Sequence, residues 1–154
     1  MRNYSQKSYL FIAGLMMMAV GIYVGVMPGD YLAGMVIEGE LDVHPALNRS
    51  SPSSLNMLSE LRGMGGLLLV FSIYILMSMF KISWRQTALF IAVMVYASFF
   101  VFRTLGFVLD GFPGAAVMLA YVIEVVMTLA GILLMDGKLL AGKRAPREKN
   151  SSVW

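Results

Sequence analysis

The chain contains no cysteine and only one histidine, and both scarcities exclude kinds of site. Without cysteine there is no disulfide, no iron–sulfur cluster and no thiol nucleophile. The histidine, His44, follows Asp42 in a short acidic stretch, and two ligands are too few for a metal centre. The sequence also shows no nucleotide-binding glycine loop and no nucleophile triad. We therefore expect no metal and no cofactor, and any catalysis would rest on carboxylates alone.

Charged residues are also scarce. Only 14% of the residues are charged and 58% are hydrophobic, whereas soluble domains contain about 25% charged and about 45–50% apolar residues. The apolar residues are concentrated in four long blocks with few charges. This distribution is typical of an integral membrane protein, and the length allows one domain.

Each apolar block is long enough to cross the membrane as a helix, which takes about 20 residues. We predict an all-α fold, an integral membrane four-helix bundle over residues 1–136, followed by a basic, mobile cytoplasmic tail over residues 137–154. The predicted spans lie near residues 8–27, 52–80, 84–109 and 113–135. Residues 31–37 are apolar but too short to span, so we expect them to lie at the interface or to tuck back against the bundle.

Basic residues are divided unequally between the two ends of the predicted helices. With four spans, both termini lie on one side of the membrane. Nine of the twelve Lys and Arg residues fall on that side, namely Arg2, Lys7, Lys81, Arg85 and the five bases of the tail. The positive-inside rule places both termini in the cytoplasm. A solvated tail, or one in contact with anionic lipid headgroups, accounts for the net charge of +3 better than nucleic acid does.

Five ionisable residues lie within or beside the outer half of the predicted spans: Glu60, Arg62, Arg103, Asp110 and Glu124. Isolated charges at such depth are costly, so they pair or mark a functional site. We expect Arg103 to contact one of the three acids, and Arg62 to contact at least one acid on another helix. The cluster either forms a polar pocket open to the outer side or closes into an ion-pair network that fixes helix register.

Small residues indicate where helices approach closely. Gly21 and Gly25 form a Gly-x-x-x-Gly face on the first span. We expect this face to pack inside the monomer rather than between two copies. On the second span, Gly63 and Gly66 either thin the helix where Arg62 reaches across or serve packing only.

Three parts of the sequence resemble a known family. They are residues 61–66, with the sequence Leu-Arg-Gly-Met-Gly-Gly, residues 103–111, which begin with arginine and end with aspartate and glycine, and Glu124. The chain resembles, over roughly residues 8–136, domain-of-unknown-function family 4345 of small bacterial four-helix inner-membrane proteins. The resemblance implies the four-helix fold, a shared polar cluster and a place in the bacterial inner membrane, and it implies no reaction.

We expect a non-enzymatic binding or accessory protein whose polar cluster takes an amphipathic or lipid-like ligand or a partner helix. Charges clustered in one leaflet suit a molecule with one polar end, and Tyr74, Tyr96 and Tyr121 are expected in the walls of the pocket. Two other functions stay open: an acid/base enzyme acting on a hydrophobic substrate, and a small proton-coupled transporter. Expected partners are membrane lipids, an amphipathic small molecule, and a membrane-protein partner or a second copy. We expect no nucleic acid.

Overall fold

The computed structural model describes residues 2–33 and 52–135, and these residues form helices and turns with no strand among them. The long helices are α1 (Arg2–Val26), α3 (Pro52–Met77), α4 (Arg85–Asp110) and α5 (Ala115–Leu134). Two short helices are α2 (Pro28–Ala33) and the 3₁₀ helix η3 (Ile82–Trp84). The predicted all-α bundle is confirmed. The acidic stretch with Asp42 and His44 and the predicted basic tail lie outside the described residues.

The long helices are membrane spans by length and composition. The stretches long and apolar enough to cross a membrane are Tyr4–Val26, Leu55–Met77, Ile82–Asp110 and Ala115–Leu134. The chain is therefore a multi-pass membrane protein. α4 ends where Gly111 adopts a φ of 97°, a backbone conformation that glycine reaches without the steric cost of a Cβ atom.

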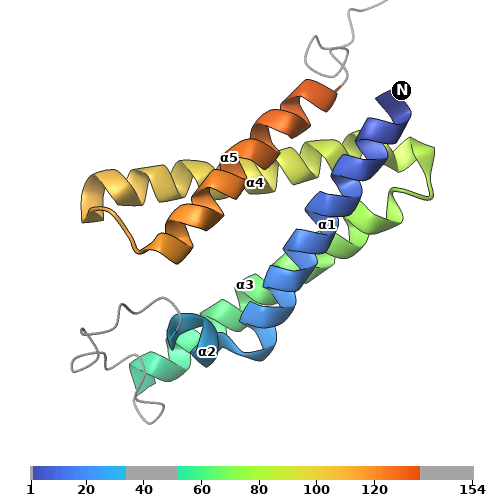
Figure 1. Ribbon diagram of the computed structural model, residues 1–154. Coiled ribbons are helices and arrows are strands. Elements are labelled where there is room, and N and C mark those ends of the chain that lie inside the picture. Colours follow the sequence, from blue (N-terminus) through green and yellow to red (C-terminus); the bar gives the residue numbers. More distant parts are fainter. Residues whose placement is uncertain (1, 34–51, 136–154) are drawn as a thin grey trace, which may run out of the picture.

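The four long helices pack as two antiparallel pairs, α1 with α3 and α4 with α5 (Figure 1). Glycines let the backbones of the first pair touch. A Cβ atom built on Gly65 would lie 2.5 Å from the amide nitrogen of Gly25 and 2.8 Å from the carbonyl oxygen of Gly21. The Gly21–Gly25 face thus packs inside the monomer against Gly65. At Gly63 and Gly66, by contrast, no described residue outside the adjacent turns of α3 lies within 4 Å of an added Cβ atom, so these two glycines do not mediate this approach.

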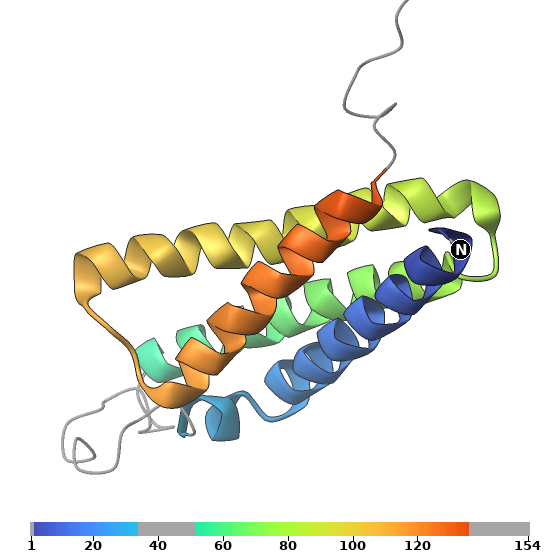
Figure 2. The ribbon, with the colours of Figure 1, turned by 45° about the horizontal axis from the view of Figure 1, so that its top comes forward.

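The two pairs are held together at one end of the bundle, here called the η3 end, where α1 begins and α5 ends (Figure 2). Tyr9 of α1 donates its hydroxyl hydrogen to the carbonyl oxygen of Met127 in α5, at 2.9 Å. Tyr96 of α4 donates to the carbonyl oxygen of Ala13 in α1, also at 2.9 Å. The apolar side chains that are fully buried in the core include Leu10, Ile75 and Leu89. These contacts close the η3 end of the bundle.

At the opposite end, here called the α2 end, the short helix α2 folds back onto α1 and α3. The rings of Tyr23 in α1 and Tyr31 in α2 meet edge to face with their centroids 6.0 Å apart. Tyr31 is half-buried, which indicates that this part of the short apolar segment has the tucked-back arrangement. Residues 34–37 of that segment lie outside the described residues.

Candidate ligand-binding site

A cavity of about 360 Å³ lies between the two helical pairs, on the α2 side of the Tyr96–Ala13 hydrogen bond. All four long helices and α2 contribute to its lining. Its apolar wall includes Met16, Met17, Val20, Met64, Leu68 and Phe99. Its polar lining consists of Tyr23, Tyr31, Tyr96, Arg103 and Glu124. The site is therefore an apolar pocket with a few polar groups, the composition typical of small-molecule sites.

Helical periodicity explains why these residues share the pocket. On α4, Tyr96, Phe99 and Arg103 are spaced three and four residues apart and therefore lie on one face of the helix. On α5, Ala120 and Glu124 are four residues apart and share a face in the same way. The small side chain of Ala120 leaves room for the cavity one turn from the carboxylate.

Arg103 and Glu124 form an ion pair across α4 and α5. The Nε atom of Arg103 donates to Oε1 of Glu124 at 2.9 Å. Only 22% of the Arg103 side chain and 9% of the Glu124 side chain are exposed. The contact expected for Arg103 is present. It is also the only ion pair between residues that the structure describes, so the expected set of several buried salt bridges is reduced to one.

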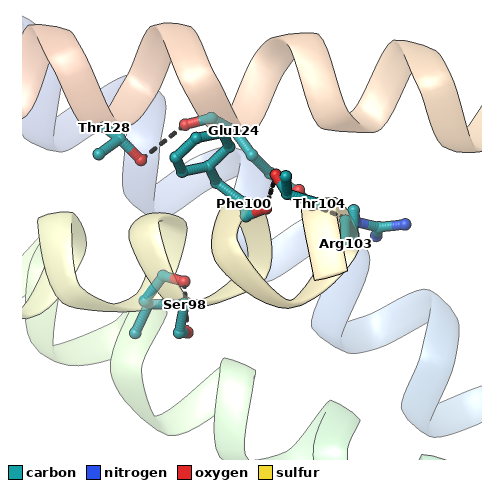
Figure 3. A network of polar contacts seen from close by, with 7 residues as sticks. Ser98, Phe100, Arg103, Thr104, Glu124 and Thr128 are labelled. Atoms are coloured by element: carbon teal, nitrogen blue, oxygen red, sulfur yellow. Dashed lines mark hydrogen bonds and ion pairs between the residues drawn. The ribbon is translucent and has the colours of Figure 1, made fainter. Parts of the chain in front are cut away.

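The ion pair uses Nε of Arg103 and Oε1 of Glu124, and the remaining polar atoms of the two side chains have different surroundings. Figure 3 shows the terminal nitrogens of Arg103 pointing away from Glu124. The second carboxylate oxygen of Glu124, Oε2, is buried and has no hydrogen-bond partner among the described residues. Nearby hydroxyls do not supply one, because Thr128 donates to the backbone carbonyl of Glu124 at 2.7 Å and Thr104 to that of Phe100 at 2.8 Å (Figure 3).

Tyr31 brings a phenol to the same part of the pocket. Burial raises the pKa of its hydroxyl above the usual value of 10.0, and the charge of Arg103 and a hydrogen bond with it oppose that rise. Tyr31 and Arg103 therefore lie within interaction distance. Sequence analysis did not single out Tyr31. The available signal was a phenol in a short apolar segment that follows the first span directly and has the tucked-back arrangement as one of its two expected places.

Of the three tyrosines expected in the walls, one lines the pocket. Tyr96 does so. Tyr74 stacks on Trp84 beside η3, with ring centroids 5.5 Å apart. The Tyr121 hydroxyl lies 3.2 Å from Oγ1 of Thr104, and its ring packs on Phe107 rather than in the pocket.

The other three predicted cluster residues are not brought to the pocket. Glu60, Arg62 and Asp110 are exposed and form no ion pair with a described residue. The acid contact expected for Arg62 is thus absent among the described residues. The physical reason is rotation of α3, which turns Met64 toward the pocket and therefore turns Arg62, two residues earlier, in another direction.

Metal-binding groups are also absent from the part of the chain that the structure describes. Within it, no three His, Cys, Asp or Glu side chains gather closely enough to hold an ion. The pocket itself contains one carboxylate, which is held by Arg103.

The arrangement can be compared with known proteins. The family model described as "Domain of unknown function (DUF4345)" matches residues 5–135. The chain belongs to this family. No curated protein and no solved structure gave a match to the chain. The DUF4345 domain includes every described helix apart from the first residues of α1, and so includes the whole pocket and the Arg103–Glu124 pair.

Proposed function

We propose that this DUF4345 protein binds an amphipathic, lipid-like molecule in the pocket between its helical pairs. The observation that supports the proposal is the combination of a mostly apolar cavity of about 360 Å³ with one ion pair at its wall. An apolar body fills the space between α1, α3 and α4, and a polar end meets Arg103 and Glu124. Intramembrane ionisable groups that face a cavity indicate function more often than structure alone.

The geometry favours binding over transport. A transporter needs a path that opens alternately to both sides of the membrane. The pocket lies on one side of the hydrogen bonds made by Tyr9 and Tyr96, which join the two pairs at the η3 end. An acid/base enzyme is less well supported, because its carboxylates would include Glu60 and Asp110, which are exposed and do not line the pocket.

The basic residues orient the proposed site. We place the η3 end in the cytoplasm and the pocket in the outer half of a bacterial inner membrane, because Lys7, Lys81 and Arg85 lie at the η3 end. In that orientation a lipid-like molecule enters from the outer leaflet. A partner helix in place of the small molecule is an alternative outcome of the test below.

The proposal is tested by filling the pocket. Ala120 lines the cavity, and Ala19 lies on an exposed face of α1. We expect Ala120→Phe to lose most of the lipid-like molecule that co-purifies with the wild type, because the added ring occupies its space. Ala19→Phe adds the same ring outside the pocket and should keep the molecule.

The measurement is native mass spectrometry of both variants, followed by extraction and identification of small molecules and co-purifying proteins. The thermal transition of each variant checks that it is folded. Equal small-molecule content in the wild type and in folded Ala120→Phe would contradict the proposal. A companion protein lost only from Ala120→Phe would assign the pocket to a partner helix.

A further inference from the structure

We propose that the bound molecule has one apolar chain and a polar head that is neutral overall and carries both a hydrogen-bond donor and an acceptor. This inference rests on the proposed function, because it names the ligand class of the same pocket. A carboxylic acid in its protonated form has such a head, and so does a monoacylglycerol.

The charge of the site argues for a neutral head. Arg103 and Glu124 balance each other at 2.9 Å in a pocket whose remaining lining is apolar or phenolic. A ligand with a net charge would leave one charge uncompensated in an environment of low polarity, which is unfavourable. An anion could enter only with a proton, and an anion plus a proton is the neutral acid.

The unused hydrogen-bonding groups argue for a head with a donor and an acceptor. Arg103 uses Nε on Glu124 and makes a hydrogen bond with Tyr31. Its terminal nitrogens, which point away from the carboxylate (Figure 3), carry more N–H donors than one phenol oxygen uses. Oε2 of Glu124 is buried without a partner and can only accept while the carboxylate is ionised. A head that accepts from Arg103 and donates to Glu124 satisfies both, and a buried acceptor left unpaired is costly.

The size and walls of the cavity argue for one chain. Its volume of about 360 Å³ is near the lower end of the range of small-molecule sites, roughly 300–1,000 Å³. Met16, Met17 and Met64 supply flexible side chains that adapt to an unbranched chain. A two-chain phospholipid exceeds this space, because each of its chains alone needs a groove of this kind.

The test compares four probes that differ mainly in the head. Palmitic acid carries a donor and an acceptor, as does monopalmitoylglycerol, whereas methyl palmitate carries acceptors only and hexadecylamine is a cation. The full chain in phosphatidylcholine nanodiscs is titrated with radiolabelled monopalmitoylglycerol, and the other probes compete. We expect methyl palmitate to bind at least about tenfold more weakly than monopalmitoylglycerol, because Oε2 of Glu124 stays unpaired.

A pH series separates the acid from the glyceride. The other titratable groups that line the pocket are the phenols of Tyr23 in α1, Tyr31 in α2 and Tyr96 in α4, and α3 contributes none. The series runs from about pH 5 to 8, a range that brackets the ionisation of a fatty acid at a membrane. Above the pKa of palmitic acid, its affinity should fall about tenfold per pH unit, because one proton must enter with it. The affinity of monopalmitoylglycerol should not change.

Two variants of the ion pair should reverse the preference for charge. Glu124→Gln leaves Arg103 uncompensated, so ionised palmitate should bind it at least about tenfold better than it binds the wild type. Arg103→Gln leaves Glu124 uncompensated and should favour hexadecylamine in the same way. Where one variant does not fold, the other variant and the wild-type pH series still test whether the site prefers a neutral head.

The outcomes keep this inference distinct from the proposed function. Equal binding of all probes by the wild type, abolished in Ala120→Phe, would overturn the neutral head and leave the pocket in place. Ionised palmitate binding the wild type as tightly as monopalmitoylglycerol would overturn the charge argument. No binding of any probe, with no effect of Ala120→Phe on co-purifying molecules, would contradict both.

Discussion

Arg103 of α4 reaches across to α5 and donates a hydrogen bond from Nε to Oε1 of Glu124 at 2.9 Å. The 6.0 Å distance from its guanidinium carbon to the ring centre of Phe99 places the cation over an aromatic face. This pair joins the two helices of one hairpin at the wall of the pocket. The two side chains should therefore be coupled in their contribution to stability.

The coupling predicts a non-additive double mutant. Arg103→Leu or Glu124→Leu alone should lower the free energy of unfolding by about 1–3 kcal/mol, because each leaves a poorly solvated charged group without its partner. The double variant, which leaves no charge, should lose less than the larger of the two single losses. Reversible unfolding in detergent measures these values. Glu60→Gln, at an exposed acid without an ion pair to a described residue, is the control and should change little. Additive losses would show that the two side chains do not interact.

The seam between α1 and α3 gives a prediction with a control on the same helix. Gly65→Ala would place a Cβ atom against the backbone of Gly25, so it should destabilise the protein by about 1–3 kcal/mol through overpacking. Gly66→Ala meets open space and should be neutral or stabilising by up to about 1 kcal/mol, since alanine favours the helix. Thermal unfolding of the two variants in one detergent makes the comparison. Equal effects would mean that the two helices do not approach closely at Gly65.

Much of the fold could be predicted because the bilayer imposes simple requirements on a sequence. Four apolar blocks of sufficient length and few charges favour helices in the bilayer, and the observed helices follow them with small shifts at their ends. The need to compensate a buried charge likewise predicted an acid beside Arg103, and Glu124 is the acid that it meets.

The rotation of each helix could not be predicted in the same way. It depends on which small residues meet a neighbour, and the sequence offers Gly63, Gly65 and Gly66 close together on α3. Only Gly65 packs against α1, and this choice turns Arg62 away from the pocket. Likewise, a helix of six residues such as α2 is too short for its periodicity to predict the contact between Tyr31 and Arg103.

The tyrosine hydrogen bonds at the η3 end should contribute to the stability of the whole bundle. Tyr9→Phe and Tyr96→Phe keep the rings and remove the hydroxyls that bond to Met127 and Ala13. Each variant should lose about 1 kcal/mol of unfolding free energy, the net value of a typical hydrogen bond. Tyr4→Phe changes a tyrosine that is 79% exposed and should lose nothing measurable. If Tyr4→Phe lost as much unfolding free energy as the other two variants, the hydroxyls of Tyr9 and Tyr96 would have no special role in stability.

The orientation of the bundle is open to a direct test because the chain contains no cysteine, so a single introduced thiol is the only one to react. Ser83 lies exposed in η3 between Lys81 and Arg85, and Asp110 lies exposed at the last residue of α4. The positive-inside rule retains the basic turn in the cytoplasm. In intact spheroplasts, a membrane-impermeant maleimide should therefore label Asp110→Cys and not Ser83→Cys, and it should label both after lysis. The reverse pattern would place the α2 end and its pocket in the cytoplasmic half, and ligands would then enter from the inner leaflet.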